Sequence, residues 1–165
     1  MNTLKIKGSL VLALTLTTAL LLAACADAPC APADTVVPGA GVGVGDDAVC
    51  LGQTRAEVEA VLGVGEAARD LGDAGLRVAH PKHKLSVHYS AKGQLTAVYL
   101  DTGATAKTAT GVGLGTAAAA AKGALGAPAE DPFMGDLWYP ATGLVVQLSG
   151  GKVAAMQIMA PQVSK

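Results

Sequence analysis

The chain has little charge and no excess of basic residues. Asp, Glu, Lys and Arg make up 15% of its 165 residues, and the formal net charge is −1. Nucleic-acid-binding proteins displace counterions with clustered Lys and Arg. The composition therefore argues against nucleic acid as a partner.

The usual patterns of catalytic and cofactor-binding residues are missing. No serine stands in a nucleophile elbow, and the glycine-rich segment 41–45 lacks the Gly-Lys-Ser/Thr of a phosphate loop. The acidic pair Asp46-Asp47 lacks the ligand spacing of a calcium loop. We therefore expect a protein that is not an enzyme and that has no cofactor.

Histidine is also scarce, with three residues packed into nine positions at His80, His83 and His88. A metal ion would need neutral imidazoles that converge at about 2.0–2.1 Å from it. Lys82 and Lys84 lie among them and would repel a cation. The three histidines are weak metal candidates, and we expect a polar strand edge and turn instead.

One apolar stretch, residues 10–22, dominates the N-terminus. Its length of about 13 residues is too short to span a bilayer core of roughly 30 Å. Lys5 and Lys7 precede it, and Leu22-Ala23-Ala24-Cys25 follows. This pattern predicts a lipoprotein signal peptide over residues 1–24 and lipidation of Cys25; an ordinary cleaved signal is the alternative.

Removal of the signal peptide changes the net charge of the mature protein, and the residues around Cys25 bear on its cellular location. Without Lys5 and Lys7, 10 Lys and Arg face 13 Asp and Glu, a formal charge of −3. Attachment to the membrane would therefore depend on acyl chains such as palmitate on Cys25. Ala26, rather than an aspartate, follows Cys25. We expect the periplasmic face of the outer membrane in a bacterial cell envelope.

Two cysteines remain once Cys25 carries lipid. Cys30 and Cys50 are 20 positions apart and would lie in an oxidising compartment, where thiols tend to pair. They are a disulfide candidate; unpaired thiols, or a bond to another chain, are the alternative.

Residues 25–38 are rich in Pro and Ala, which predicts an extended tether after the lipidated N-terminus.

The remainder reads as an internal duplication, with repeat 1 over residues 39–103 and repeat 2 over residues 104–161. Segment 49–63 aligns with segment 112–126 without a gap, and Leu95-Thr96-Ala97-Val98 aligns with Val153-Ala154-Ala155-Met156. Chance similarity in a chain rich in Ala and Gly is the alternative.

Each repeat predicts one helix followed by strands. Thr54 and Glu57 form a capping-box pattern, and Thr116 is expected to open the second helix. Leu95, Ala97 and Tyr99 alternate with the period of a half-buried strand. The expected fold class is α+β, with two tandem helix-plus-antiparallel-strand repeats packed as one unit.

These motifs resemble a known family. Leu51-Gly52-Gln53-Thr54, followed by a short helix that ends at Leu62-Gly63, is similar to the repeat of SmpA/OmlA-like and β-lactamase-inhibitor-like small lipoproteins. The second copy repeats the theme at Leu114-Gly115 and at Trp138-Tyr139-Pro140. The resemblance implies helix-plus-sheet modules that bind other proteins and lack catalytic residues.

Aromatic residues make up only 3% of the chain, so Trp138 and Tyr139 stand out as interface candidates. The alternative is that Trp138 fills the core.

We expect a non-catalytic, lipid-anchored protein that binds another envelope protein as scaffold or inhibitor. The alternative function is a binding module for a small ligand, a metal or an envelope polymer, in a groove between the repeats.

Overall fold

A computed structural model describes residues 30–129 and 135–162 of the chain. The predicted signal peptide 1–24 and Cys25 lie outside these residues. Among the helices that are described, none is long and apolar enough to cross a membrane.

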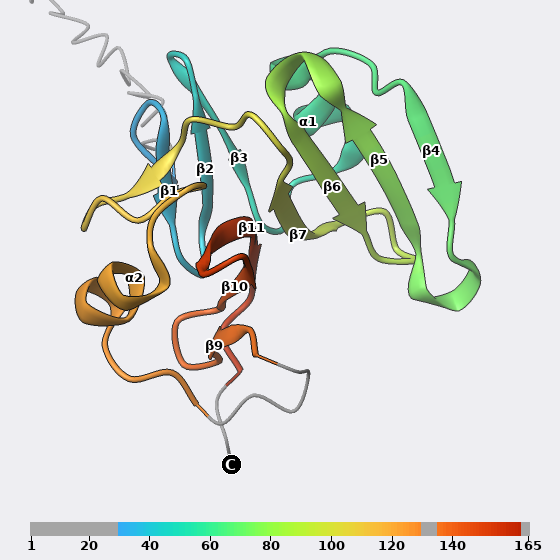
Figure 1. Ribbon diagram of the computed structural model, residues 1–165. Coiled ribbons are helices and arrows are strands. Elements are labelled where there is room, and N and C mark those ends of the chain that lie inside the picture. Colours follow the sequence, from blue (N-terminus) through green and yellow to red (C-terminus); the bar gives the residue numbers. More distant parts are fainter. Residues whose placement is uncertain (1–29, 130–134, 163–165) are drawn as a thin grey trace, which may run out of the picture.

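The described residues form two sheets, two α-helices and two short 3-10 helices (Figure 1). The strands are β1 (Thr35–Val37), β2 (Gly41–Val44), β3 (Asp47–Cys50), β4 (Ala67–Asp70), β5 (Leu76–His80), β6 (Leu85–Tyr89), β7 (Leu95–Leu100), β8 (Lys107–Thr108), β9 (Leu137–Tyr139), β10 (Leu144–Ser149) and β11 (Lys152–Met159). The helices are α1 (Arg55–Leu62) and α2 (Ala118–Leu125), with 3-10 turns η1 (Gly72–Ala74) and η2 (Pro81–His83).

The larger sheet has seven strands in the order β4-β5-β6-β7-β11-β10-β9. Two antiparallel meanders, β5-β6-β7 and β9-β10-β11, meet where β7 pairs with β11. The smaller sheet has the order β3-β2-β1-β8, in which β1 and β8 run parallel.

The start of α1 follows directly from its sequence. The Thr54 amide donates to Glu57 Oε2 at 2.7 Å, and the Glu57 amide donates back to Thr54 Oγ1 at 3.4 Å. This is the predicted capping box, and it satisfies two N–H groups that the first turn would otherwise leave unpaired. Gly63, at a φ of 76°, ends the helix in a conformation that costs a glycine little.

The start of α2 differs from the prediction. Ala117 is its N-cap, and no side chain caps this helix. Thr116, expected to open the helix, accepts a hydrogen bond from the Gly113 amide at 3.1 Å and so fixes the preceding turn.

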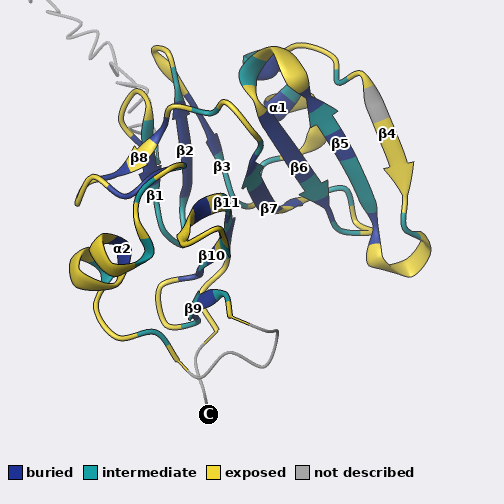
Figure 2. Cartoon of the chain, viewed as in Figure 1, coloured by how far each residue is buried: buried dark blue, intermediate teal, exposed yellow. Residues whose placement is uncertain are grey.

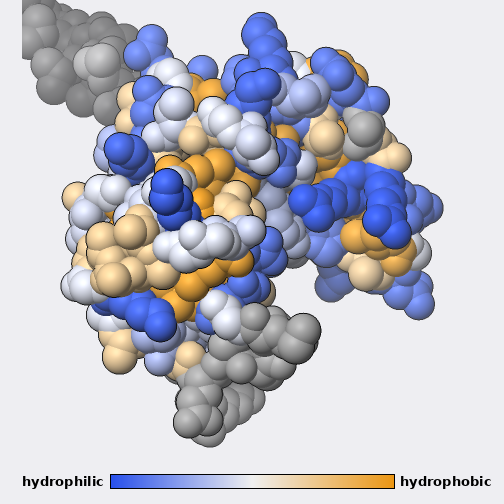
Figure 3. Space-filling view, viewed as in Figure 1, coloured by the Kyte–Doolittle hydropathy of each residue, from blue (hydrophilic) through white to orange (hydrophobic). Residues whose placement is uncertain are grey.

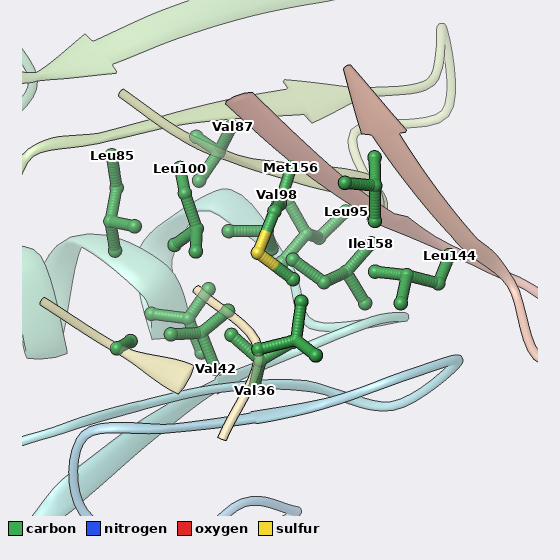
Figure 4. Close-up of a cluster of buried hydrophobic side chains, with 14 of the residues drawn as sticks. Val36, Val42, Leu85, Val87, Leu95, Val98, Leu100, Leu144, Met156 and Ile158 are labelled. Atoms are coloured by element: carbon green, nitrogen blue, oxygen red, sulfur yellow. The ribbon is translucent and has the colours of Figure 1, made fainter. Parts of the chain in front are cut away.

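One hydrophobic core lies between two layers. The inner face of the larger sheet packs against the smaller sheet, and Val58 of α1 and Ala121 of α2 belong to the same buried cluster. Figure 4 shows Val36 and Val42 of the smaller sheet next to Leu100 and Met156 of the larger one. Figure 2 shows the buried residues gathered between these layers, whereas β4 at the edge is mostly exposed.

The expected α+β class is wrong. The fold is mostly β, with 42% of the described residues in strands and 17% helical, and it is not a pair of helix-plus-strand repeats. Each α-helix is only eight residues long, and strands β4 to β7 of predicted repeat 1 share one sheet with strands β9 to β11 of predicted repeat 2. Segments 35–37, 41–44 and 47–50 form strands of a second sheet. Gly41 and Gly43 allow close approach of neighbouring backbone there, because a Cβ at either position would meet a backbone oxygen of Val49 or Pro32.

The folded part of the chain also begins earlier than the predicted boundary at residue 38. Ala31 and Val36 are each only 1% exposed, and β1 pairs with both β2 and β8. Residues 30–38 are thus part of the folded structure and not of an extended tether.

The backbone nevertheless repeats several hydrogen bonds at the positions that the sequence aligns. Gly52 donates to the Leu95 carbonyl at 2.8 Å, and the aligned Gly115 donates to the Val153 carbonyl at 2.8 Å. Lys84 donates to the Pro81 carbonyl at 3.2 Å, as Gly143 does to the Pro140 carbonyl. The sequence correspondence therefore extends to the way in which helix and hairpin are joined.

Candidate functional site

The outer face of the seven-stranded sheet is the face turned away from the core. A row of directly paired residues crosses five of its strands: Ser86 of β6, Tyr99 of β7, Gln157 of β11, Val145 of β10 and Trp138 of β9. All of them except Ser86 are partly exposed. We call this row, together with Arg77 of β5, the outer-face row.

Tyr99 and Arg77 form the best-defined contact on this face. The guanidinium carbon of Arg77 lies 4.2 Å from the centroid of the Tyr99 ring. Arg77 and Tyr99 come from strands that both neighbour β6, so the cation crosses over that strand to reach the ring. Stacking holds both long side chains against the sheet, which lowers the entropy that a partner would have to remove.

Trp138 lies at the other end of the row and borders a groove of about 660 Å³. Val145, Gln157 and Met159 form further parts of its wall. The indole is half-buried. Trp138 therefore belongs to a concave surface of the outer face and does not fill the core.

Tyr139, the second interface candidate, points the other way. It is 7% exposed, and its hydroxyl donates to the Gly126 carbonyl at 3.2 Å. Burial raises the pKa of this hydroxyl. Successive residues of a strand face opposite sides of a sheet, so Trp138 and Tyr139 cannot both belong to one surface.

The three histidines do not converge. His80 is buried on the inner face, His83 lies in η2, and His88 is on the outer side of β6 with its Nε2 2.8 Å from the Ala74 carbonyl oxygen. The described part of the chain contains no group of three or more His, Cys, Asp or Glu side chains that could hold a metal ion.

Two polar atoms are buried on the inner face, in the neighbourhood of α1. His80 Nε2 and the Tyr89 hydroxyl have no hydrogen-bond partner in the structure. Burial lowers the pKa of His80 and raises that of Tyr89 to about 12. The Arg55–Glu59 ion pair of α1, with a 2.7 Å contact, acts electrostatically on both groups. A neutral imidazole and a neutral phenol are the forms that this environment favours.

Cys30 and Cys50 are joined by a disulfide, with their Cα atoms 5.8 Å apart. The bond connects the segment before β1 to the last residue of β3. It thus fixes the N-terminal end of the described chain to the smaller sheet.

A second apolar cleft lies between the smaller sheet and α2. Its volume is about 190 Å³, and Val36, Pro38, Thr108 and Leu125 line part of it. Figure 3 shows hydrophobic residues at the surface in this region, beside α2. The cleft is smaller than the usual range for a ligand pocket, about 300–1,000 Å³. The outer-face groove is therefore the better candidate site.

Sequence reasoning did not identify Tyr99, Arg77 or Gln157 as surface residues. The alternation of β7 predicted that Tyr99 shares a face with Leu95. A β-bulge intervenes, because Tyr89 pairs with Leu95 whereas His88 pairs with Ala97, which leaves Thr96 as the extra residue. The bulge turns Tyr99 to the outer face, and nothing in the local sequence signals it.

Comparisons of the chain with protein-family models, with curated proteins and with solved structures found no match.

Proposed function

We propose that this protein is a non-catalytic, lipid-anchored component of the bacterial envelope that binds another envelope protein through its outer-face row. The observation that supports the proposal most directly is the chemistry of this row. Trp138, Tyr99 and Arg77 lie on the same face, in a chain with one tryptophan and three tyrosines. Trp, Tyr and Arg are the residue types enriched at the energetic centres of protein interfaces.

The outer face also has the rigidity that such an interface needs. Its side chains stand on paired strands, and Tyr99 and Gln157 occupy the centre of the sheet, where β7 and β11 join the two meanders. A preformed surface of this kind loses little conformational freedom on binding. The anchor predicted at Cys25 would keep the surface close to partners in the same membrane.

Co-purification from detergent-solubilised native membranes, with a C-terminal tag, tests the proposal. We expect one envelope protein at near-stoichiometric yield with the unaltered chain. Tyr99→Ala and Arg77→Ala should each reduce that yield by about tenfold, equivalent to roughly 1.4 kcal/mol of binding energy. Lys122→Ala, at an exposed position of α2, is the matched control and should leave the yield unchanged.

A Cys25→Ser variant separates the anchor from the surface. It should lose the partner in cells, yet bind the purified partner in solution as well as the unaltered chain does. Recovery of the same protein with the Tyr99→Ala and Arg77→Ala variants would contradict an interface on the outer face.

A further inference from the structure

The groove beside Trp138 differs in chemistry from the rest of the outer face. Three amide side chains line it: Gln147 of β10, Gln157 of β11 and Gln162 after the last strand. Each amide offers both a donor N–H and an acceptor carbonyl. Asp136 adds a carboxylate, one oxygen of which accepts a hydrogen bond from the Leu148 amide at 3.3 Å.

Apolar groups make up the other part of the wall. The Trp138 indole, Val145 and Met159 lie next to the amides, and Trp138, Val145 and Gln157 are direct neighbours on adjacent strands. Two strand spacings separate Trp138 from Gln157, a span of roughly 10 Å, which has room for about two sugar rings.

We infer that this groove binds a neutral oligosaccharide. A pyranose ring has an apolar C–H face that packs on an indole, and hydroxyls around its edge that both donate and accept hydrogen bonds. Amides that donate and accept match those hydroxyls, and aromatic walls with a few placed polar groups are the usual make-up of a small-molecule site. The groove and the sugar thus present the same alternation of apolar and polar surface.

Other ligand classes fit this chemistry less well. None of the described residues that line the groove is Lys, Arg or His, so this described wall offers no cationic side chain to an anionic ligand. A purely apolar ligand, such as an acyl chain, would remove the glutamine amides from water without replacing their hydrogen bonds, which is costly for each group. An uncharged polyol avoids both penalties.

Trp138 is the only tryptophan of the chain, so its fluorescence reports on the groove alone. The full-length lipoprotein, purified in detergent, would be titrated with two neutral probes: the β-1,4-linked tetramer of N-acetylglucosamine and maltotetraose. We expect a saturable change of emission with at least one of them, with a dissociation constant below about 1 mM. No saturable change with either probe up to about 10 mM would overturn the inference.

Variants followed by isothermal titration calorimetry assign the binding to this groove. Trp138→Ala and Gln147→Ala should each weaken binding of the probe about tenfold or more. Lys122→Ala, at an exposed position of α2 outside the groove, is the matched control and should bind as the unaltered chain does. Full binding by Trp138→Ala, with an unchanged circular dichroism spectrum, would also overturn the inference. Trp138, Val145 and Gln157 belong to both the groove and the outer-face row, but no protein partner enters this experiment, so its failure can be told apart from a failure of the co-purification above.

Discussion

Tyr99 of β7 lies directly opposite Gln157 of β11, at the middle of the seven-stranded sheet. The sequence alignment that matches Leu95 with Val153 makes these two residues each other's counterpart. The alignment exchanges the pairs on either side, since it matches Val98 with Met156 and Leu100 with Ile158, while Val98 pairs with Ile158 and Leu100 with Met156. The two meanders are therefore related by a local pseudo-twofold axis through this pair, and the outer-face row crosses it.

The two-layer arrangement predicts a large loss of stability at one residue of β11 and almost none at its neighbour. Ile158 is fully buried, so Ile158→Ala should lower the free energy of unfolding by about 2–5 kcal/mol. Gln157→Ala, one position away on the outer face, should change it by less than about 0.5 kcal/mol. Urea denaturation followed by circular dichroism measures both. Equal losses for the two variants would contradict the assignment of the faces.

The burial of His80 predicts that the protein loses stability in acid. Its burial lowers its pKa below the ordinary value of 6.5, so the unfolded chain binds the proton more readily than the folded one. Stability should be constant with respect to this group above about pH 6.5 and should fall as the pH drops from there through the folded-state pKa. Melting temperatures recorded between pH 7.5 and pH 5 check this.

The groups around His80 define the control for that experiment. His83 and Arg55 disfavour its protonation and Glu59 favours it. His80→Leu removes the buried titrating group and should flatten the pH dependence below pH 6.5, whereas His88→Gln should retain the slope of the unaltered chain. An unchanged slope in His80→Leu would refute the assignment to His80.

The disulfide between Cys30 and Cys50 closes a loop of 20 positions. Its removal by the paired change Cys30→Ala and Cys50→Ala should lower the free energy of unfolding by about 3 kcal/mol in the chain-entropy model. A reducing agent should lower the melting temperature of the unaltered chain and have no effect on the double variant. If reduction destabilises both proteins equally, the bond is not the cause.

Because the two helices differ at their N-caps, we expect one substitution there to lower the stability of the protein and another to raise it. Thr54→Ala removes the capping box of α1 and should cost about 1 kcal/mol. Ala117→Ser adds a hydroxyl at the uncapped start of α2 and should stabilise by up to about 1 kcal/mol. Thermal unfolding of both variants would test the caps. A Thr54→Ala protein as stable as its parent would show that the box contributes little.

The capping box, the glycine end of α1 and the hairpin strands could be predicted from the sequence, because each depends on residues close together in the chain. The predominance of strands could not be predicted from the sequence. Segment 41–44 alternates Gly and Val, and its role as a strand depends on pairing with β1 and β3, which local propensity does not encode. The fold class was wrong for this reason.

The candidate site was predictable only in part. Trp138 was proposed because it is the single tryptophan, and Tyr139 was assigned to the same surface although strand geometry turns it into the core. Tyr99 was missed because a bulge at Thr96 reverses the face that simple alternation gives it. Groove residues such as Gln157 and Gln162 have no sequence signal and come together only through the packing of the strands.

Site-specific photo-crosslinking in intact cells tests the proposed protein interface most directly. A benzophenone amino acid would replace Tyr99 on the outer face, or Lys122 on α2 as the control. We predict one discrete adduct with an envelope protein from position 99 and none from position 122. No adduct at position 99, or the same adduct from both positions, would contradict an interface on the outer face of the sheet.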